Sequence, residues 1–320
     1  MTLAALGWTR RRQLDFASHT DAGLVPGRIV GEHRTHFQVA TDAGELSAEI
    51  TGRLRNDALQ RSDLPGVGDF VALRPAAGDG PASLESVLTR SSALIRKASG
   101  EERPQLIAAN VDIAFIVMGL DGDFNLARLE RFLTLVRESR ARPIIIANKA
   151  DLSSDANAAV ADIAAVAPGI PAHVMSARDG RGVEVLASYF QGNQTAVLVG
   201  SSGAGKSTLT NALLGSKAQA TGDVRAHDSR GCHTTTHRQL FLRPGGGSII
   251  DTPGMRGLEA WTTHEPILAD FTDIEALAAR CRFRDCRHLT EPACAVRAAL
   301  KAGSLDPARY EAFSKMRSAR

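Results

Sequence analysis

The sequence predicts a multidomain protein in which a small antiparallel β-barrel precedes an α/β domain with a mostly parallel sheet and a mainly helical C-terminal segment. Three observations predict this order. Short apolar alternations punctuated by glycine run to about residue 87, alternating strand and helix signals follow residue 105, and strand signals stop beyond residue 254. With 320 residues, the chain is long enough for two or three domains.

The N-terminal strands are short and nearly evenly spaced, which is typical of a small barrel. They are expected at residues 28–31, 36–40, 46–50 and 68–73. A run rich in glycine and proline at 75–81 predicts a loop, and residues 91–104 predict a linker with several basic side chains. We therefore place an OB-like barrel domain, together with an N-terminal extension, at residues 1–90.

Alternating strands and helices fill the central part of the chain, which is the pattern of βαβ units in a parallel sheet. Strands are expected at 111–118, 143–147, 171–175 and 195–199. Helices are expected at 125–140, 155–166 and 181–190. We place this α/β domain at residues 91–262 and a mainly helical domain at residues 263–320.

A glycine-rich loop lies between the last of these strands and a following helix. It matches the pattern G-x-x-x-x-G-K-[ST], with Thr208 directly after it, and its residues are Gly200, Ser201, Ser202, Gly203, Ala204, Gly205, Lys206 and Ser207. Small residues let successive backbone N–H groups point at phosphate oxygens, and the helix N-terminus adds partial positive charge. Lys206 would neutralise the β- and γ-phosphate oxygens, and the Ser207 hydroxyl would bind Mg²⁺. The loop predicts a nucleoside triphosphate site.

The tetrapeptide NKAD, which follows an apolar strand, indicates the base. The Asp151 carboxylate can accept two hydrogen bonds, from N1–H and the exocyclic amine of guanine, whereas adenine offers no such donor pair on that edge. Asn148 would tie the base to neighbouring loops, and the aliphatic stem of Lys149 would cover the base plane. Ser176 and Ala177, which end the next strand, could present a backbone N–H to guanine O6.

The tetrapeptide DTPG also follows an apolar strand, so Asp251 emerges at the carboxyl end of a strand, where Mg²⁺ would lie. Asp251 would act on the metal through water, and the N–H of Gly254 would sense the γ-phosphate. Upstream, residues 216–237 are polar and lack apolar periodicity. Thr235 in this stretch would complete the Mg²⁺ shell when triphosphate is bound, because switch segments order around the γ-phosphate.

Three of the four cysteines lie close together near the C-terminus, in the pattern Cys281-x4-Cys286-x-His288-x5-Cys294. Three thiolates and one imidazole make a full tetrahedral set with no vacancy for water, which predicts one structural Zn²⁺ and not a catalytic metal. Residues 280–301 carry six basic and two acidic side chains. This composition suits either a solvated charged face or contact with nucleic-acid phosphates.

The order of the nucleotide motifs is unusual. In the Ras-like GTPase fold the P-loop comes first, whereas here the NKAD element and Ser176-Ala177 precede it, and Thr235 and the DTPG element follow. If the original N- and C-termini of a domain are joined and the chain is opened in another loop, the folded domain keeps the same site. The sequence therefore predicts a circularly permuted GTPase domain.

This order, with a barrel before it and a Cys/His cluster after it, resembles the small-subunit-dependent ribosome-biogenesis GTPases known as RsgA or YjeQ. The resemblance runs from about residue 27 to the end of the chain, and includes residues 108–112 at the entry to the GTPase domain and 233–236 in the switch. It implies an OB-fold domain, a permuted GTPase and a zinc-binding domain that act in late assembly of the small ribosomal subunit. It also implies that the subunit stimulates hydrolysis of GTP to GDP and phosphate.

The residue that positions the attacking water is expected in the switch. In Ras-like enzymes a glutamine follows the glycine of the DTxG element, but Met255 stands there in this chain and cannot serve. The resemblance points instead to His233, whose imidazole can orient water or briefly accept its proton. We expect His233, Lys206 and Thr235 to form the catalytic set.

The remaining expectations concern partners and location. No stretch approaches eighteen apolar residues and no signal peptide precedes the barrel, so we expect a cytoplasmic protein without a membrane partner. The net charge of +3 does not by itself indicate a nucleic-acid partner. The resemblance implies the small subunit and its rRNA as partners, beside GTP and GDP, and we expect a monomer. Two other functions stay open: an RNA-binding scaffold that uses GTP only as a conformational ligand, and a GTPase switch that serves a protein partner.

Overall fold

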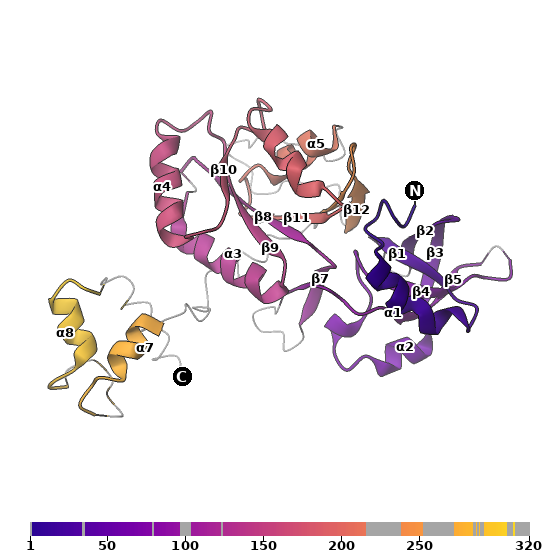
Figure 1. The fold of residues 1–320 in the computed structure, drawn as a ribbon, viewed down its shortest axis with the longest axis horizontal. Helices are drawn as coiled ribbons and strands as arrows, with labels where there is room; N and C mark the ends of the chain where they lie inside the picture. The colour runs from indigo at the N-terminus through magenta and orange to yellow at the C-terminus, as the bar shows by residue number, and fades with distance from the viewer. Residues whose placement is uncertain are drawn as a thin grey trace, which may run out of the picture. The chain divides into compact units, whose positions relative to one another are not determined.

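The computed structural model of the chain describes residues 2–33, 36–78, 80–96, 104–122, 124–215, 238–251, 272–283, 286, 288, 291–305 and 310. Two compact units make up the chain: an N-terminal unit, Met1–Ala260, and a C-terminal unit, Trp261–Arg320 (Figure 1). Each unit has its own buried apolar core. Among the described residues, no helix has the length and apolar composition needed to cross a membrane.

Five strands close into the predicted barrel at the start of the N-terminal unit: β1 (Val25–Glu32), β2 (Phe37–Thr41), β3 (Gly44–Ile50), β4 (Phe70–Arg74) and β5 (Ala82–Val87). Strand β1 pairs with both β2 and β4 in the antiparallel sense, which closes the sheet on itself. One pair differs from the prediction of an antiparallel barrel, because β3 and β5 run parallel. The helix α2 (Gly52–Asp57) and the 3₁₀ turn η1 (Arg61–Asp63) supply the connection that this parallel pairing requires.

A helix that the sequence prediction missed packs on the barrel. Helix α1 (Arg10–Thr20) is capped by the Thr9 side chain, which accepts from the N–H of Arg12, and only Phe16 of its residues is buried. Phe16 joins Phe70 of β4 in a small apolar cluster. A helix with a single buried residue has no apolar stripe, so periodicity alone gave no signal.

The rest of the N-terminal unit is an α/β domain built on a mostly parallel sheet. Its strands are β8 (Ile113–Gly119), β9 (Arg142–Asn148), β10 (Ala172–Val174), β11 (Thr195–Gly200), β12 (Gln239–Leu242) and β13 (Ser248–Asp251), in the spatial order β10-β9-β8-β11-β13-β12. Among the described strands of this six-stranded part of the sheet, β12 alone runs antiparallel to its neighbour, β13. The predicted parallel sheet is confirmed.

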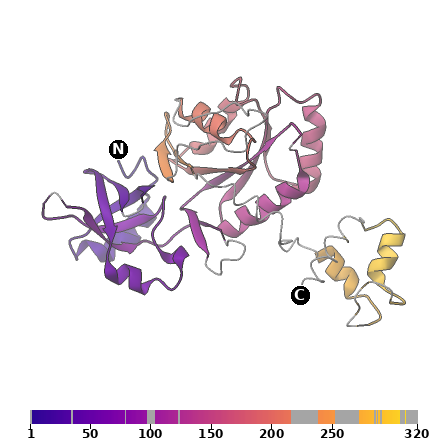
Figure 2. The ribbon, with the colours of Figure 1, turned by 180° about the vertical axis from the view of Figure 1, so that it is seen from behind.

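Helices cover both faces of this sheet (Figure 1, Figure 2). Helix α3 (Leu126–Ser139) and helix α4 (Ala156–Val166) share one core cluster with it, and the 3₁₀ segment η2 (Val183–Phe190) and helix α5 (Lys206–Leu214) share the other. Asn125 caps α3 by accepting from the N–H of Arg128, and Arg140 ends it in a left-handed conformation with φ 68°. These bounds match the predicted helices closely, although the third is 3₁₀ and not α.

Strands that the sequence did not predict lie where the barrel meets the α/β domain. The segment predicted as a linker contains β6 (Ala93–Arg96), which pairs with β7 (Gln105–Ala109) in a separate two-stranded sheet. In addition, barrel strand β1 pairs with the edge strand β12, so that one continuous eleven-stranded sheet runs through both parts. The sequence prediction placed no strand at β5, β6, β7 or β12.

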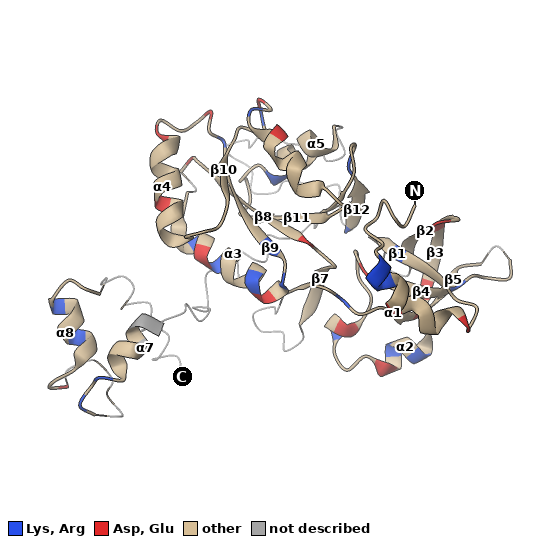
Figure 3. Cartoon of the chain, viewed as in Figure 1, with Lys and Arg blue, Asp and Glu red and all other residues tan. Residues whose placement is uncertain are grey.

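The described part of the C-terminal unit includes two short helices, α7 (Thr272–Ala278) and α8 (Ala295–Lys301). Its core combines Ile274, Val296 and Leu305 with the side chains of Cys286 and Cys294. Four basic side chains are exposed in its described part: Arg280, Arg282, Arg297 and Lys301. Basic residues are seen on α8 in Figure 3. The apolar core is small, so the cysteines account for a large share of it.

Candidate nucleotide site and metal centre

The predicted nucleotide motifs meet at one edge of the α/β sheet. Strand β9 ends at Asn148, β11 ends at Gly200 and β13 ends at Asp251, and the strands that carry them run parallel through β8. Ser176 follows β10, whose strand is parallel to β9. Parallel strands bring their carboxyl ends to the same edge, where open α/β sheets bind ligands.

Two glycines of the P-loop are fixed by close backbone approach. Gly200 has φ 146°, and a Cβ there would lie 2.1 Å from the carbonyl oxygen of Val117 on β8. Gly205 has φ 94°, and a Cβ there would lie 2.2 Å from Asn148 Nδ2. Both positions exclude a side chain, so the loop presses its backbone against β8 and against the NKAD element.

Side chains from two directions hold the P-loop. The Lys206 ammonium donates to the carbonyl oxygens of Gly200 at 2.7 Å and Ser201 at 2.5 Å. Arg128, in the first turn of α3, donates through Nη1 to Ser201 Oγ at 2.8 Å. Ser201 and Ala204 are buried, whereas Ser202, Gly203 and Ser207 are exposed and Thr208 is half-buried. A phosphate entering this loop would therefore compete with carbonyls for the Lys206 ammonium.

Asn148 connects three segments of the candidate base site. Its Nδ2 donates to the Ala204 carbonyl in the P-loop at 2.9 Å, and its Oδ1 accepts from the N–H of Ala177 at 2.9 Å. The side chain is 2% exposed, so these two bonds are made away from water. The predicted role of Asn148 in tying neighbouring loops together agrees with this geometry.

Asp151 presents its carboxylate to solvent. The Ser176 hydroxyl donates to Asp151 Oδ1 at 2.8 Å. This hydrogen bond to the charged form is the main reason that the pKa of Asp151 lies below its ordinary value. The carboxylate is therefore ionised at neutral pH, as an acceptor for two guanine donors requires.

Lys149 is fixed by a partner that sequence reasoning did not identify. Its backbone is left-handed, with φ 61°, and its ammonium forms an ion pair with Asp121 just beyond β8. Both side chains are about one quarter exposed. Asp121 lies 28 residues from Lys149, and Arg128 lies 73 residues from its partner Ser201, so neither contact leaves a local signal in the sequence.

Several predicted site residues lie outside the described part of the chain: His233, Thr235 and Gly254. Asp251 is described, and it is half-buried at the end of β13 and pairs with Gln239 of β12. Its carboxylate and the exposed Ser207 hydroxyl are hard oxygen donors, which suit Mg²⁺. Asp251 ends β13 and Ser207 follows β11, and the two parallel strands end at the P-loop edge.

The C-terminal unit brings the predicted metal ligands together. Ligand atoms of Cys281, Cys286, His288 and Cys294 all lie within 4.8 Å of one another. His288 Nδ1 is 3.4 Å from Cys294 Sγ and 3.6 Å from Cys281 Sγ, and the two sulfurs are 3.9 Å apart. A tetrahedron with metal–sulfur bonds of about 2.3 Å has edges of about 3.8 Å, so the donor set fits Zn²⁺.

The surroundings of this cluster orient its ligands. His288 has φ 64°, and its carbonyl oxygen accepts from the Tyr310 hydroxyl at 2.6 Å. Burial raises the pKa of Cys286 to about 11, so without a cation this thiol is protonated at neutral pH. A bound metal would replace that proton.

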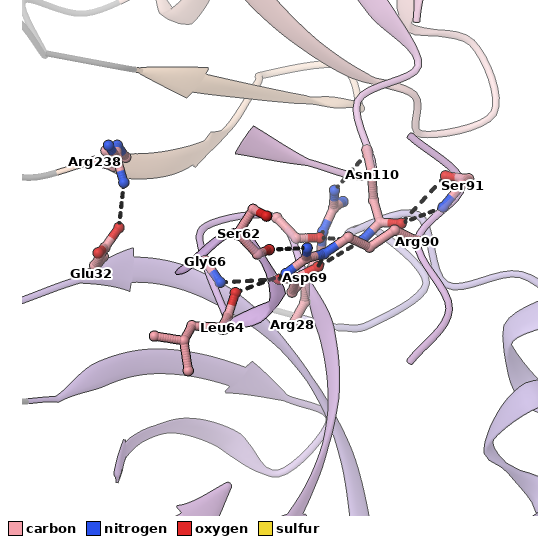
Figure 4. A network of polar contacts seen from close by, with 11 residues as sticks. Arg28, Glu32, Ser62, Leu64, Gly66, Asp69, Arg90, Ser91, Asn110 and Arg238 are labelled. Carbon is pink, nitrogen blue, oxygen red and sulfur yellow. Dashed lines mark hydrogen bonds and ion pairs between the residues drawn. The ribbon is translucent and has the colours of Figure 1, made fainter. Parts of the chain in front are cut away.

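A buried polar network links the barrel to the P-loop strand, and sequence reasoning missed it entirely. We call this set of Arg28, Asp69, Arg90 and Asn110 the junction network (Figure 4). Arg28 is 1% exposed and donates to the Gly68 carbonyl at 3.2 Å, to the Asn110 carbonyl at 3.2 Å, to the Leu6 carbonyl, and to Thr195 Oγ1 at 2.9 Å. Burial lowers its pKa to about 9, which still leaves it charged at neutral pH.

Asp69 supplies the opposite charge in the junction network. Arg90 binds it in a bidentate manner, with Nε 2.8 Å from Oδ1 and Nη2 2.7 Å from Oδ2. Burial moves the pKa of Asp69 upward, and the Arg90 guanidinium opposes that shift. Asn110 adds a left-handed backbone, with φ 53°, and donates from Nδ2 to the Gly68 carbonyl at 3.1 Å.

Comparison with known proteins agrees with this geometry. The family model described as RsgA GTPase matches residues 87–261, which is more than half of the chain. The chain belongs to the RsgA GTPase family. The match covers the P-loop, the NKAD element and the DTPG element together. The predicted GTPase assignment and family resemblance are confirmed.

Named relatives of the RsgA family align over nearly the whole chain. The small ribosomal subunit biogenesis GTPase RsgA of Opitutus terrae is 44% identical over 99% of this chain and 89% of its own length. The protein of the same name from Xanthomonas axonopodis pv. citri is 43% identical over 99% of this chain and 88% of its own length.

Solved structures show the same fold. YjeQ from Thermotoga maritima superposes with a TM-score of 0.62 at 26% identity, covering 92% of this chain and 97% of that protein. YloQ, described as a circularly permuted GTPase, superposes with a TM-score of 0.59 at 26% identity, covering 93% and 96%. The predicted permutation of this RsgA family member is confirmed.

Proposed function

We propose that this RsgA family member hydrolyses GTP on the small ribosomal subunit during late maturation, that it binds the subunit through rRNA, and that the subunit stimulates its turnover. The names of its relatives support the ribosomal part of this proposal. The observation that carries the nucleotide part is the placement of Asn148, which joins the P-loop to Ala177 while the neighbouring Asp151 carboxylate stays open to solvent.

Residues near Asn148 would recognise the guanine base. Asp151 accepts from N1–H and the exocyclic amine, the stem of Lys149 covers the base, and a backbone N–H at Ser176 or Ala177 donates to O6. The P-loop from Gly200 to Ser207, with Thr208, surrounds the phosphates with N–H donors, and Gly254 contacts the γ-phosphate. The hydrogen bonds of Asn148 hold the base subsite and the phosphate subsite at a fixed separation. This fixed separation favours binding of a guanosine nucleotide over binding of free base or free phosphate.

Ser207, Thr235 and Asp251 would hold Mg²⁺, which neutralises phosphate charge when it is bound with GTP. Lys206 places its ammonium on the β- and γ-phosphates after leaving the loop carbonyls. His233 orients the attacking water, because Met255 cannot. A catalytic side chain on a switch segment acts only when that segment is held in place, which accounts for stimulation by a large partner.

The C-terminal unit would hold one structural Zn²⁺ through Cys281, Cys286, His288 and Cys294. Its exposed basic side chains suit contact with rRNA phosphates.

We propose three domains, at residues 1–90, 91–262 and 263–320, and that the protein acts as a monomer in the cytoplasm.

Multiple-turnover hydrolysis of GTP, with and without purified small subunits, tests this proposal. Strong stimulation by subunits is the expected result. GTP binding without turnover would instead indicate an RNA-binding scaffold, and turnover indifferent to subunits would indicate a switch for a protein partner. Either result would overturn the proposed function.

The preference for guanine over other bases can be tested separately. In Asp151→Asn the carboxylate becomes an amide that donates from its NH₂, so it matches the O2 carbonyl of xanthine better than the amine of guanine. We expect GDP affinity to fall by at least tenfold and xanthosine diphosphate affinity to rise, since an unpaired buried donor costs about 1–3 kcal/mol. Unchanged preference for guanine would remove Asp151 from base recognition.

A further inference from the structure

A cavity lies where helix α1, the barrel and the α/β domain meet. Its volume is about 280 Å³, just below the usual range of about 300–1,000 Å³ for pockets that hold drug-sized ligands. Three parts of the N-terminal unit line it: α1 with the residues before it, the barrel with the segment after β5, and the residues at the start of β8 and β11. The cavity therefore has room for a small ligand with walls from distant parts of the chain.

The cavity and the nucleotide site lie at opposite ends of β11. Thr195, the first residue of this strand, lines the cavity, and Gly200, the last, opens the P-loop. With a rise of about 3.3 Å per residue, the two ends are roughly 17 Å apart. A ligand in the cavity would therefore occupy a site separate from that of the nucleotide phosphates.

More arginines than carboxylates line the cavity: Arg11, Arg12, Arg28 and Arg90 against Asp15 and Asp112. The charge of Arg90 is balanced by its bidentate contact with the buried Asp69. The other three arginines still outnumber the two carboxylates, both of which belong to exposed residues. The walls of the cavity thus carry net positive charge.

Two of these guanidinium groups lack a carboxylate partner. Arg28 is 1% exposed, and it donates to three backbone carbonyls and to the Thr195 hydroxyl (Figure 4). Arg12 is half-buried, and its Nη2 donates to Ser91 Oγ at 3.2 Å and to Asn110 Oδ1 at 3.1 Å. Within the described part of the chain, neither guanidinium forms an ion pair. Because buried charges are ordinarily paired, these two point to an anionic ligand.

The Phe70 ring brings the same two cations close together. Arg12 Cζ lies 3.9 Å and Arg28 Cζ 4.6 Å from the centroid of this ring. Burial is the main reason that the pKa of each arginine is lowered, and the positive charge of Arg12 helps to lower the pKa of Arg28 to about 9. An anion beside them would stabilise both charged groups.

The beginning of α1 supplies further hydrogen-bond donors. Thr9, which caps this helix, lines the cavity together with Arg11 and Arg12 of its first turn. The first N–H groups of a helix have no acceptor within the helix, and its dipole places partial positive charge there. The Ser91 hydroxyl and the Gln194 amide also line the cavity and can donate. Guanidinium groups and a helix N-terminus are the donors that proteins use to bind phosphate.

We propose that this cavity binds a small phosphate anion, either inorganic phosphate or the phosphate group of a small metabolite, through Arg11, Arg12 and the start of α1, with Arg28 supplying buried positive charge. Phosphate suits the site better than a carboxylate because its tetrahedral oxygens can accept from donors in several directions. A bound anion would hold α1 against the barrel and the start of β11. This site does not take part in the proposed hydrolysis of GTP.

Titration calorimetry on the full chain tests the proposal, with inorganic phosphate as the probe. Mg²⁺ and a non-hydrolysable GTP analogue saturate the nucleotide site, so that phosphate cannot bind in the P-loop. We expect one site with a Kd of about 1 mM or tighter. Hexauridylate, titrated separately, distinguishes a small-anion site from a surface for nucleic acid.

Three variants locate the site. Arg12→Met keeps the length of the side chain and removes its charged donors, so phosphate affinity should fall at least tenfold. Asp112→Asn removes a carboxylate from the wall and keeps an oxygen that can accept from the Thr195 N–H, now bound at 2.8 Å. It should raise phosphate affinity about threefold, a gain that a misfolded variant could not produce. Arg10→Gln is the matched control, because it removes an exposed positive charge from the same helix, and it should stay within twofold of wild type.

Several results would overturn the inference. One is the absence of phosphate binding by wild type up to about 10 mM. Others are an equal loss of affinity in Arg10→Gln and Arg12→Met, or wild-type affinity in both Arg12→Met and Asp112→Asn. Binding of hexauridylate that depends on Arg12, without binding of phosphate, would assign the cavity to a nucleic-acid surface instead. Since GTP turnover enters none of these measurements, failure of the proposed function would leave their outcome unchanged.

Discussion

Arg28 of the barrel donates through Nη1 to Thr195 Oγ1, at 2.9 Å, on the first residue of the strand that leads into the P-loop. The two residues are 167 positions apart in the chain. One buried cation thus fixes the barrel to the base of the nucleotide-binding strand, so the barrel stabilises the GTPase domain.

Replacing Arg28 should destabilise the N-terminal unit strongly. In Arg28→Met the carbonyls of Leu6, Gly68 and Asn110 lose a buried donor, and Asp69 loses a neighbouring positive charge. We expect the free energy of unfolding to fall by about 3–5 kcal/mol, measured by urea denaturation. Arg74→Met, which breaks an exposed pair, should change it by less than about 1 kcal/mol. Equal effects of the two variants would show that the junction network adds no stability.

The pH below which the protein loses its affinity for nucleotide should depend on Ser176. Guanine binding needs the Asp151 carboxylate, so affinity is present above the ordinary carboxyl pKa and is lost as pH falls through the lowered pKa of Asp151 in the folded protein. Ser176→Ala removes the hydroxyl that mainly lowers this pKa. We expect the loss of GDP affinity to move to higher pH, followed by fluorescent GDP titrations from about pH 6 to about pH 2.5, a range that includes the ordinary carboxyl pKa of about 3.9.

Ser188→Ala is the control for this shift, because the Ser188 hydroxyl donates only to the Val185 carbonyl, at 2.8 Å, on η2. Circular dichroism at each pH separates loss of binding from acid unfolding. An acid midpoint that Ser176→Ala leaves in place would show that the hydroxyl does not set the charge of Asp151.

Removing zinc should unfold the C-terminal unit alone. Its core includes Cys286 and Cys294, and the pKa of Cys286, raised to about 11 by burial, means that metal binding must displace a proton. We expect a strong chelator to abolish amide protection in α7 and α8 while protection in β8 and β11 persists, as read by hydrogen exchange. Zinc affinity should also weaken as pH falls. Unchanged protection of α8 after metal removal would contradict a structural role.

His233→Ala should separate binding from turnover. The imidazole is proposed to act on water and not on the phosphates, so GTP affinity should be retained while subunit-stimulated kcat falls by about 10²-fold or more. His237→Ala, four residues away in the same stretch, should keep stimulated turnover within a few fold. If single-turnover kinetics of His233→Ala match those of wild type, this residue has no part in the mechanism.

The nucleotide edge could be predicted from sequence because its signals are local. The P-loop, the NKAD element and Asp251 each directly follow an apolar run, and a run of that kind is recognisable as a buried strand without knowledge of its neighbours. Asn125 and Arg140 likewise sit at the ends of the helix predicted at 125–140 and serve as its caps. The four metal ligands fall within fourteen residues, so their convergence required no long-range information.

The contacts that sequence reasoning missed are long-range and polar. Arg28 stands in an alternating strand pattern where a solvent-facing side chain is the ordinary expectation, and only its distant partners make burial tolerable. Strand β12 has four residues and directly follows a polar stretch, too short a pattern to recognise. The parallel pair β3–β5 depends on how the barrel closes, which no window of sequence encodes.

The continuous sheet has one consequence for a fragment that lacks the barrel. Strand β1 pairs with β12 at one position, Gly31 with Gln239, and a chain cut before the GTPase domain would leave the start of β12 open to pairing with another strand. Such a fragment would be prone to self-association through the exposed strand. The barrel therefore also covers the start of β12, the one point in the described sheet at which this side of the strand is paired.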